Sequence, residues 1–272
     1  MKKGISIWSF AEESLEKCFA LAKDAGFDGV ELALDKTGLV SLESTKEDLE
    51  KVKAMAKAAG IELYSVASLL YWEKNYIDND ALARKEAIEI TKKHLEVASI
   101  LGCESILVVP GAVSADIRYD EAYDRCYEAL CELAPVAEKF GVELCIENVW
   151  NKFLLSPLEM RDLIDKVASK YVGAYFDVGN ILLTGFPDQW INILGTRIKK
   201  VHFKDYKTGV GSLDGFVDIL GGDVDYIAVM KAFAEVGYDG WATAEMLPPY
   251  KLFPETILYN TSNAMDKIFS VK

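Results

Sequence analysis

The sequence predicts an α/β fold in which eight strands and eight helices alternate to form a single (β/α)₈ barrel domain over residues 1–272. Three observations lead to this prediction. A helix end that contains glycine recurs five times, eight short apolar runs are typical of buried parallel strands, and helical patterns lie between these runs. The length of 272 residues also matches the roughly 250 residues of a typical barrel.

The recurring helix end places a glycine between a helical pattern and an apolar run. It is found at Gly26, Gly60, Gly102, Gly141 and Gly237. A glycine at this point closes a helix in the left-handed conformation, because it has no Cβ that would oppose a positive φ. The order along the chain is therefore helix, glycine, buried strand.

The eight strands are expected near residues 4–8, 29–34, 62–69, 105–110, 142–149, 172–178, 198–204 and 240–246. The helices are expected near 14–25, 45–59, 80–101, 119–140, 156–168, 187–194, 225–236 and 254–269. Regular alternation favours a closed barrel, and an open doubly wound sheet is the alternative. No linker rich in Pro or Ser divides the chain, so we expect one domain.

The longest irregular stretch, residues 206–224, follows the seventh strand and contains five glycines. Loops that follow barrel strands collect at the face that carries active sites. We therefore expect this stretch to cover a substrate, and a flexible surface loop is the alternative.

Composition excludes several classes of protein. A formal net charge of −13 opposes nucleic-acid binding, which depends on Lys and Arg. The N-terminus lacks a signal-peptide pattern, and no stretch approaches the roughly 20 apolar residues of a membrane span. We expect a soluble, cytoplasmic protein whose five cysteines (Cys18, Cys103, Cys126, Cys131, Cys145) are reduced, buried thiols.

Four ligand-type residues lie at the ends of four successive predicted strands. They are Glu147, Asp177, His202 and Glu245. Polar groups in apolar strands are costly unless they are satisfied, and neighbouring strand ends of a barrel converge. Taken singly, the glutamates could be solvated charges, Asp177 a helix N-cap and His202 a core histidine. The combination predicts one shared site, whereas His94, in the middle of a helix, is expected to have no role.

A divalent metal ion explains why three carboxylates would be brought together, because without a cation they would repel each other and take up protons. One imidazole and three carboxylates form an oxygen-rich set of ligands. Such a set suits Mn²⁺, Mg²⁺ or Co²⁺ best, with Zn²⁺ or Fe²⁺ as further candidates.

These residues stand in motifs that resemble the sugar isomerase and epimerase superfamily with a xylose-isomerase-like barrel, above all ketose 3-epimerases and hexulose-6-phosphate isomerases. The motifs are Ile146-Glu147-Asn148-Val149-Trp150-Asn151, Phe176-Asp177-Val178-Gly179-Asn180, Val201-His202-Phe203-Lys204-Asp205 and Gly240-Trp241-Ala242-Thr243-Ala244-Glu245-Met246. The resemblance covers the whole chain. It implies that the four predicted ligands bind one divalent ion, that Glu147 and Glu245 are also the catalytic acid and base, and that the protein is a dimer or tetramer.

The implied chemistry moves a proton α to a ketone, while a metal ion on the carbonyl oxygen stabilises the enediolate. Return of the proton to the opposite face of the same carbon is 3-epimerisation, the favoured reaction. Return to the adjacent carbon is aldose–ketose isomerisation. The substrate is expected to be a small sugar or sugar phosphate.

The chain departs from the ketose 3-epimerase pattern at positions that hold the substrate. Asn180 stands where the family usually has a histidine, and Phe153 stands where it has a glutamate. In place of an arginine after the seventh strand, Lys204 and Lys207 are available, and they could bind a phosphate.

Aromatic residues near the strand ends are candidates for the apolar wall of a sugar site. They are Trp8 and Trp150, with Tyr71 or Trp72 as further candidates. Packing in the core or on the surface is the alternative for each of them.

Other activities remain possible on the same barrel. A dehydratase acting on a keto-inositol or on dehydroshikimate would use the same metal and bases to expel a hydroxyl group. A non-enzymatic sugar-binding protein would not need a metal flanked by two glutamates. An endonuclease for abasic DNA needs more histidines than the two in this chain.

Overall fold

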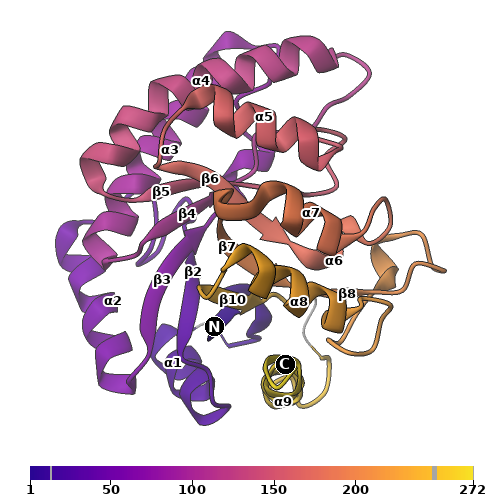
Figure 1. Cartoon of the computed structure of the whole chain (residues 1–272). Coiled ribbons are helices and arrows are strands. Elements are labelled where there is room, and N and C mark those ends of the chain that lie inside the picture. Colours follow the sequence, from indigo (N-terminus) through magenta and orange to yellow (C-terminus); the bar gives the residue numbers. More distant parts are fainter. Residues whose placement is uncertain (13, 247–249, 272) are drawn as a thin grey trace. The chain divides into compact units, whose positions relative to one another are not determined.

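The computed structural model describes residues 1–12, 14–246 and 250–271. Eight strands form a closed barrel in the order β1-β10-β7-β6-β5-β4-β3-β2 (Figure 1). Their bounds are β1 Lys2–Ser6, β2 Gly29–Ala33, β3 Glu62–Ala67, β4 Ser105–Val108, β5 Glu143–Glu147, β6 Val172–Asp177, β7 Ile198–Phe203 and β10 Trp241–Ala244. The predicted closed barrel is confirmed, and the open doubly wound sheet is excluded.

The main helices also follow the prediction, and the ends of strands and helices alike agree to within two residues. They are α1 Leu15–Asp24, α2 Lys46–Ala59, α3 Ala81–Leu101, α4 Tyr119–Phe140, α5 Pro157–Val167, α7 Pro187–Leu194, α8 Tyr226–Val236 and α9 Thr256–Phe269. One short helix, α6 (Val178–Ile181), was not predicted. It is a single turn, which is too short to show a helical period.

The five predicted helix-closing glycines all have a positive φ, between +67° and +89°. Gly102 illustrates why. Its N–H donates to the last turn of α3, and the N–H of the next residue, Cys103, donates to Ala98 O at 2.8 Å. This pair of bonds satisfies carbonyls that a helix end leaves open, and it directs the chain into the next strand.

Contacts divide the chain into two compact units. The first unit comprises Met1–Glu31, Lys53–Leu63 and Phe176–Lys272. Phe203 lies at its core, with ring centroids 5.1 Å from Tyr226 and 6.5 Å from Phe233. A buried lysine of β1, Lys3, donates to Ser262 Oγ at 2.9 Å and so ties β1 to α9.

The loop over residues 206–224 belongs to this first unit and is more ordered than we predicted. It contains a two-stranded antiparallel sheet of β8 (Asp205–Tyr206) and β9 (Phe216–Val217). The buried Asp205 carboxylate accepts backbone N–H groups from Leu220 at 2.9 Å and Val224 at 3.1 Å. The prediction of an irregular stretch is therefore wrong in part, because strands of two residues show no period of their own.

The second unit comprises Leu32–Val52 and Tyr64–Tyr175 and has a buried polar network in its core. His94 Nε2 lies 3.0 Å from Val66 O, and its Nδ1 lies 3.0 Å from the hydroxyl of Tyr71. Thr91 Oγ1 lies 3.1 Å from that hydroxyl and 2.5 Å from the hydroxyl of Tyr76. Because a carbonyl oxygen only accepts, Nε2 carries the hydrogen. Burial lowers the pKa of His94 to about 3, so the imidazole is neutral at pH 7. His94 is a satisfied core histidine.

This network predicts that acid destabilises the protein through His94. Burial lowers the pKa of His94 to about 3, although its hydrogen bond to Val66 opposes the shift. An unfolded histidine has a pKa of about 6.5, so the unfolded chain takes up a proton that the folded chain refuses. Stability from this group is complete above pH 6.5 and is lost as the pH falls towards 3. At pH 5.5 the free energy of unfolding should be lower by about 1.4 kcal/mol.

The measurement compares the wild type with His94→Gln at pH 7.5 and 5.5. Between these two values the wild type should lose about 1.4 kcal/mol more than the variant, because Gln does not titrate. Equal losses in both proteins would show that His94 does not control this transition.

The five cysteines are free thiols. Cys18, Cys103, Cys126 and Cys145 are buried, as predicted, but Cys131 is exposed on α4, so the prediction of a buried thiol is wrong there. The apolar, buried face of this helix contains the neighbouring residues Leu130 and Leu133 instead. None of the helices in the described part of the chain has the length and apolar character that a membrane span requires.

Candidate metal and acid–base site

Two adjacent strands of the first unit carry a histidine, a lysine and a glutamate of the candidate site. His202 lies in β7, and Lys204 follows two residues later, so the two side chains point to the same side. His202 pairs in register with Thr243 of β10. Glu245 follows β10, and its N–H donates to Phe203 O at 3.2 Å, which extends this register by another step. The strand ends thus place His202, Lys204 and Glu245 together.

Asp177 ends β6 and also caps the helix that follows. Its Oδ1 accepts the N–H of Asn180 at 2.8 Å, which starts the single turn α6. The other oxygen, Oδ2, faces His202 Nδ1 at 3.9 Å and Lys204 Nζ at 3.0 Å. The N-cap role that the sequence suggested is therefore real, but it uses one oxygen and leaves the other directed at the site.

Glu245 lies closest to the cationic groups. Its Oε2 is 3.0 Å from His202 Nδ1 and 2.6 Å from Lys204 Nζ. Burial by itself would raise the pKa of Glu245, but the ammonium charge of Lys204 and the adjacent imidazole of His202 outweigh it and hold this pKa well below its usual range. The carboxylate is consequently ionised at neutral pH.

A further carboxylate, Glu31 of β2, was missed in the sequence analysis. It is fully buried, and its Oε1 lies 2.9 Å from His202 Nε2. A carboxylate on one imidazole nitrogen fixes the hydrogen there and directs the lone pair of the other nitrogen into the site. Glu31 could have been found by the same rule as the others, since it is a charged residue within the apolar run Gly29–Ala33.

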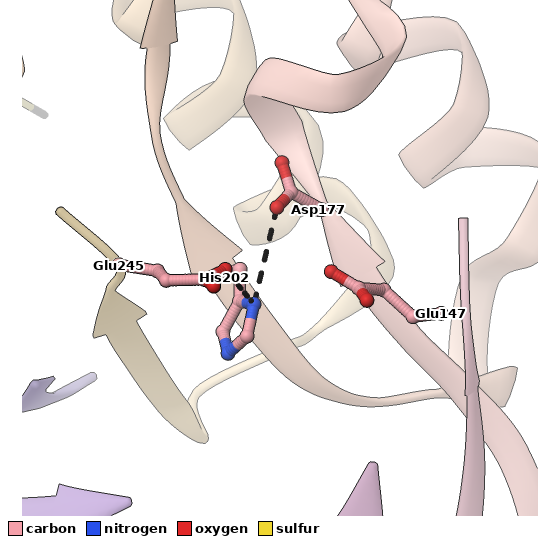
Figure 2. Close-up of side chains that lie close together, drawn as sticks. All are labelled: Glu147, Asp177, His202 and Glu245. Atoms are coloured by element: carbon pink, nitrogen blue, oxygen red, sulfur yellow. Dashed lines mark ion pairs between the residues drawn. The ribbon is translucent and has the colours of Figure 1, made fainter. Parts of the chain in front are cut away.

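Glu147 ends β5 in the second unit and is buried. Together with Asp177, His202 and Glu245 it forms one group, in which each residue offers a ligand atom within 4.8 Å of the others (Figure 2). The four residues predicted as metal ligands are thus the four that the structure gathers. This buried cluster could hold a metal ion.

The donor chemistry fits a divalent cation. With the hydrogen of His202 on Nε2, towards Glu31, the lone pair of Nδ1 faces Glu245 Oε2 at 3.0 Å. Two acceptors at this distance repel each other unless the imidazole is protonated or a cation lies between them. Oxygen donors and one imidazole nitrogen are ligands that Mg²⁺, Mn²⁺, Co²⁺ and Zn²⁺ accept.

The predicted substrate residues lie in different surroundings. Asn180 is buried in α6, and Lys204 is 15% exposed inside the carboxylate group. Trp8 and Trp150 are half-buried in the segments that follow β1 and β5. Lys207 is exposed after β8, where its backbone N–H donates to Gly215 O at 2.8 Å. Among these residues, Asn180 contacts Asp177 through its backbone N–H, and Lys204 contacts Asp177 and Glu245 through its side chain.

Two other positions belong to the core. Phe153 is buried, with its ring centroid 5.6 Å from that of Tyr119. The hydroxyl of Tyr71 is used in the His94 network, so Tyr71 is a core residue rather than part of a sugar-binding wall. Trp72, in contrast, is exposed. The residues flanking Phe153, Lys152 and Leu154, both have a positive φ, which shows that this loop has an unusual backbone course.

Comparison with known proteins agrees with this architecture. A family model described as a xylose isomerase-like TIM barrel matches residues 19–261. The chain is 26% identical over 246 residues to the L-ribulose-5-phosphate 3-epimerase UlaE of Salmonella heidelberg, covering 87% of this chain and 83% of that protein. D-psicose 3-epimerase from Clostridium cellulolyticum H10 shares the fold with a TM-score of 0.83 at 20% identity, over 100% of this chain and 99% of that one.

The IolI protein, whose crystal structure contains a bound zinc atom, also shares the fold. Its TM-score is 0.83 at 20% identity, and the match covers 99% of this chain and 98% of that one.

Proposed function

The chain belongs to the xylose isomerase-like TIM barrel family, and from this premise we propose that it is a metal-dependent 3-epimerase of a ketose or ketose phosphate. The observation that carries the proposal is the buried group of three carboxylates and one imidazole at strand ends. The epimerase relative named above supports the reaction class. The altered substrate-binding positions, Asn180 and Phe153, are the reason to leave the sugar open.

Glu147, Asp177, His202 and Glu245 would hold the ion, which when bound would polarise the substrate carbonyl and stabilise negative charge on its oxygen. The suitable ions are Mn²⁺, Mg²⁺ or Co²⁺, with Zn²⁺ and Fe²⁺ as further candidates. Glu31 orients His202 by accepting its Nε2–H. Asp177 has one oxygen left for the ion, because its other oxygen caps α6.

Glu147 and Glu245 are the proposed acid and base. In the strand order they come from β5 and β10, with β6 and β7 between them. One carboxylate removes the proton from C3 of the ketose, and the other delivers a proton to the opposite face of the same carbon, which inverts it. In the two-base scheme each of the two carboxylates is the base for one epimer and the acid for the other.

The substrate would be held by groups around this pair. Trp8 and Trp150 offer apolar surface, and Asn180 offers an amide. Lys204 and Lys207 would bind sugar oxygens or a phosphate. If a proton returned to the adjacent carbon instead, the same residues would perform aldose–ketose isomerisation.

The test is proton NMR of the Mn²⁺-loaded protein in D₂O with a panel of ketoses and ketose phosphates. Deuterium at C3 together with the second epimer is the expected result. Deuterium at C1 would assign aldose–ketose isomerisation. Loss of water from a keto-inositol or from dehydroshikimate, without exchange in any ketose, would assign a dehydratase and contradict the proposal.

A further inference from the structure

Lys204 occupies an unusual position for a substrate-binding lysine, because its ammonium group lies among the candidate metal ligands themselves. Nζ is 3.0 Å from Asp177 Oδ2 and 2.6 Å from Glu245 Oε2. These are the same oxygens that face His202 Nδ1. The ammonium group therefore neutralises the two carboxylates in the place where a divalent ion would do so.

The backbone of Lys204 is fixed, so any movement must come from its side chain. Tyr226 donates its hydroxyl hydrogen to Lys204 O at 2.9 Å. On the other side, α6 packs so closely that a Cβ on Gly179 would lie 2.6 Å from Lys204 Cβ and 3.1 Å from its carbonyl carbon. A glycine at position 179 is what allows this approach. These contacts restrain the backbone at the strand end, whereas the lysine stem is a flexible chain of four methylene groups.

A divalent ion and this ammonium group cannot share the same oxygens. An ion bound to Asp177 and Glu245 would lie close to Nζ, where the two positive charges would repel each other strongly because little water screens them in a buried site. We infer that Lys204 is a built-in counter-cation, which balances the carboxylates of the metal-free protein and is displaced when a divalent ion binds. The inference rests on the proposed metal-dependent function and adds a residue that sets the metal affinity.

The ring of Phe216 lies near the ammonium group of Lys204 and could hold it after displacement. Nζ already lies 5.7 Å from the ring centroid of Phe216 in β9, at a distance where an ammonium is attracted to an aromatic face. β9 is held by its pairing with β8, so the Phe216 ring is in place, and the side chain of Lys204 is 15% exposed, so solvent reaches part of it. Moved in this direction, the ammonium group becomes free to contact a substrate only after the ion has bound.

The decisive experiment measures Mn²⁺ affinity by isothermal titration calorimetry at about pH 8, without any sugar, for the wild type and for Lys204→Met. Methionine is unbranched and only one heavy atom shorter than lysine, and it has no charge. The variant should bind Mn²⁺ about tenfold more tightly or better, because the ion no longer has to break two ion pairs and displace a like charge. Lys207→Met, which removes an exposed lysine three residues away, should leave the affinity within about twofold, as expected for a screened surface charge.

A second measurement follows the thermal unfolding of the protein without metal. Without metal, Lys204→Met should unfold at a lower temperature than the wild type, since two buried carboxylates lose their counter-charge. Lys204→Gln, which keeps a hydrogen-bond donor, serves if the methionine variant does not fold.

The outcomes test the counter-cation inference and the proposed function separately. Equal or weaker Mn²⁺ binding by both Lys204 variants, with normal binding by the wild type, would overturn the counter-cation inference and leave the proposed function intact. Absence of Mn²⁺ binding by wild type and variants alike would contradict the proposed function itself.

Discussion

Glu147→Gln and Glu245→Gln are each expected to lower kcat for epimerisation by about a hundredfold to ten-thousandfold, the contribution that general acid–base groups usually make. Gln keeps the shape of the side chain but cannot take or give the proton. Both variants should fold, because each position lies at a strand end rather than within the packed barrel. The measurement is steady-state turnover with saturating metal, alongside circular dichroism.

Hydrogen exchange with D₂O tests the two proposed bases separately. If two bases act on opposite faces, each variant keeps one of them. Each should then still exchange the C3 proton of one epimer with D₂O, while the other epimer is not formed. The two variants should exchange opposite epimers.

Glu143→Gln provides the matched control, because it is the same substitution at the other end of the same strand, β5. It should keep near-normal turnover. The two-base scheme would be wrong if either Glu147→Gln or Glu245→Gln retained near-full activity.

Most of the fold was predictable because each barrel strand carries a local signal. β5, for example, follows Gly141, which closes α4, and has three apolar residues between Glu143 and Glu147. The secondary-structure elements that could not be predicted are short. α6 has one turn, and β8 and β9 have two residues each. The two strands pair with each other across an intervening loop, and the Asp205 carboxylate of β8 accepts the N–H of Leu220, 15 residues further along the chain.

The candidate site could also be predicted only in part. Its four predicted ligands could be recognised because the ends of neighbouring parallel strands meet. Glu31 was missed because a single charge inside an otherwise apolar run was counted as part of the strand. The position of Lys204 between Asp177 and Glu245 had no sequence signal, because a side chain with four rotatable bonds can lie in many places.

Removal of the metal is expected to abolish turnover without unfolding the protein. The barrel core does not depend on the ion, and in our proposal Lys204 compensates two of the carboxylates when the ion leaves. A metal ion added back at about 100 times its dissociation constant should stabilise the fold by about 2.7 kcal/mol. The measurement is dialysis against a chelator, followed by activity and thermal unfolding as Mn²⁺, Mg²⁺, Co²⁺, Zn²⁺ or Fe²⁺ is added.

The two histidines of the chain supply a matched pair for this experiment. His202→Gln removes one of the four proposed ligands, the imidazole. The variant protein should therefore need a far higher metal concentration to recover any activity. His94→Gln removes an equally buried imidazole from the second unit, where it bonds to Val66 and Tyr71. It should lower the stability but leave the metal titration as in the wild type. Full turnover in protein shown by elemental analysis to be free of metal would contradict the proposal, because Glu147 and Glu245 would then have moved the proton without a cation to stabilise the charge on the carbonyl oxygen.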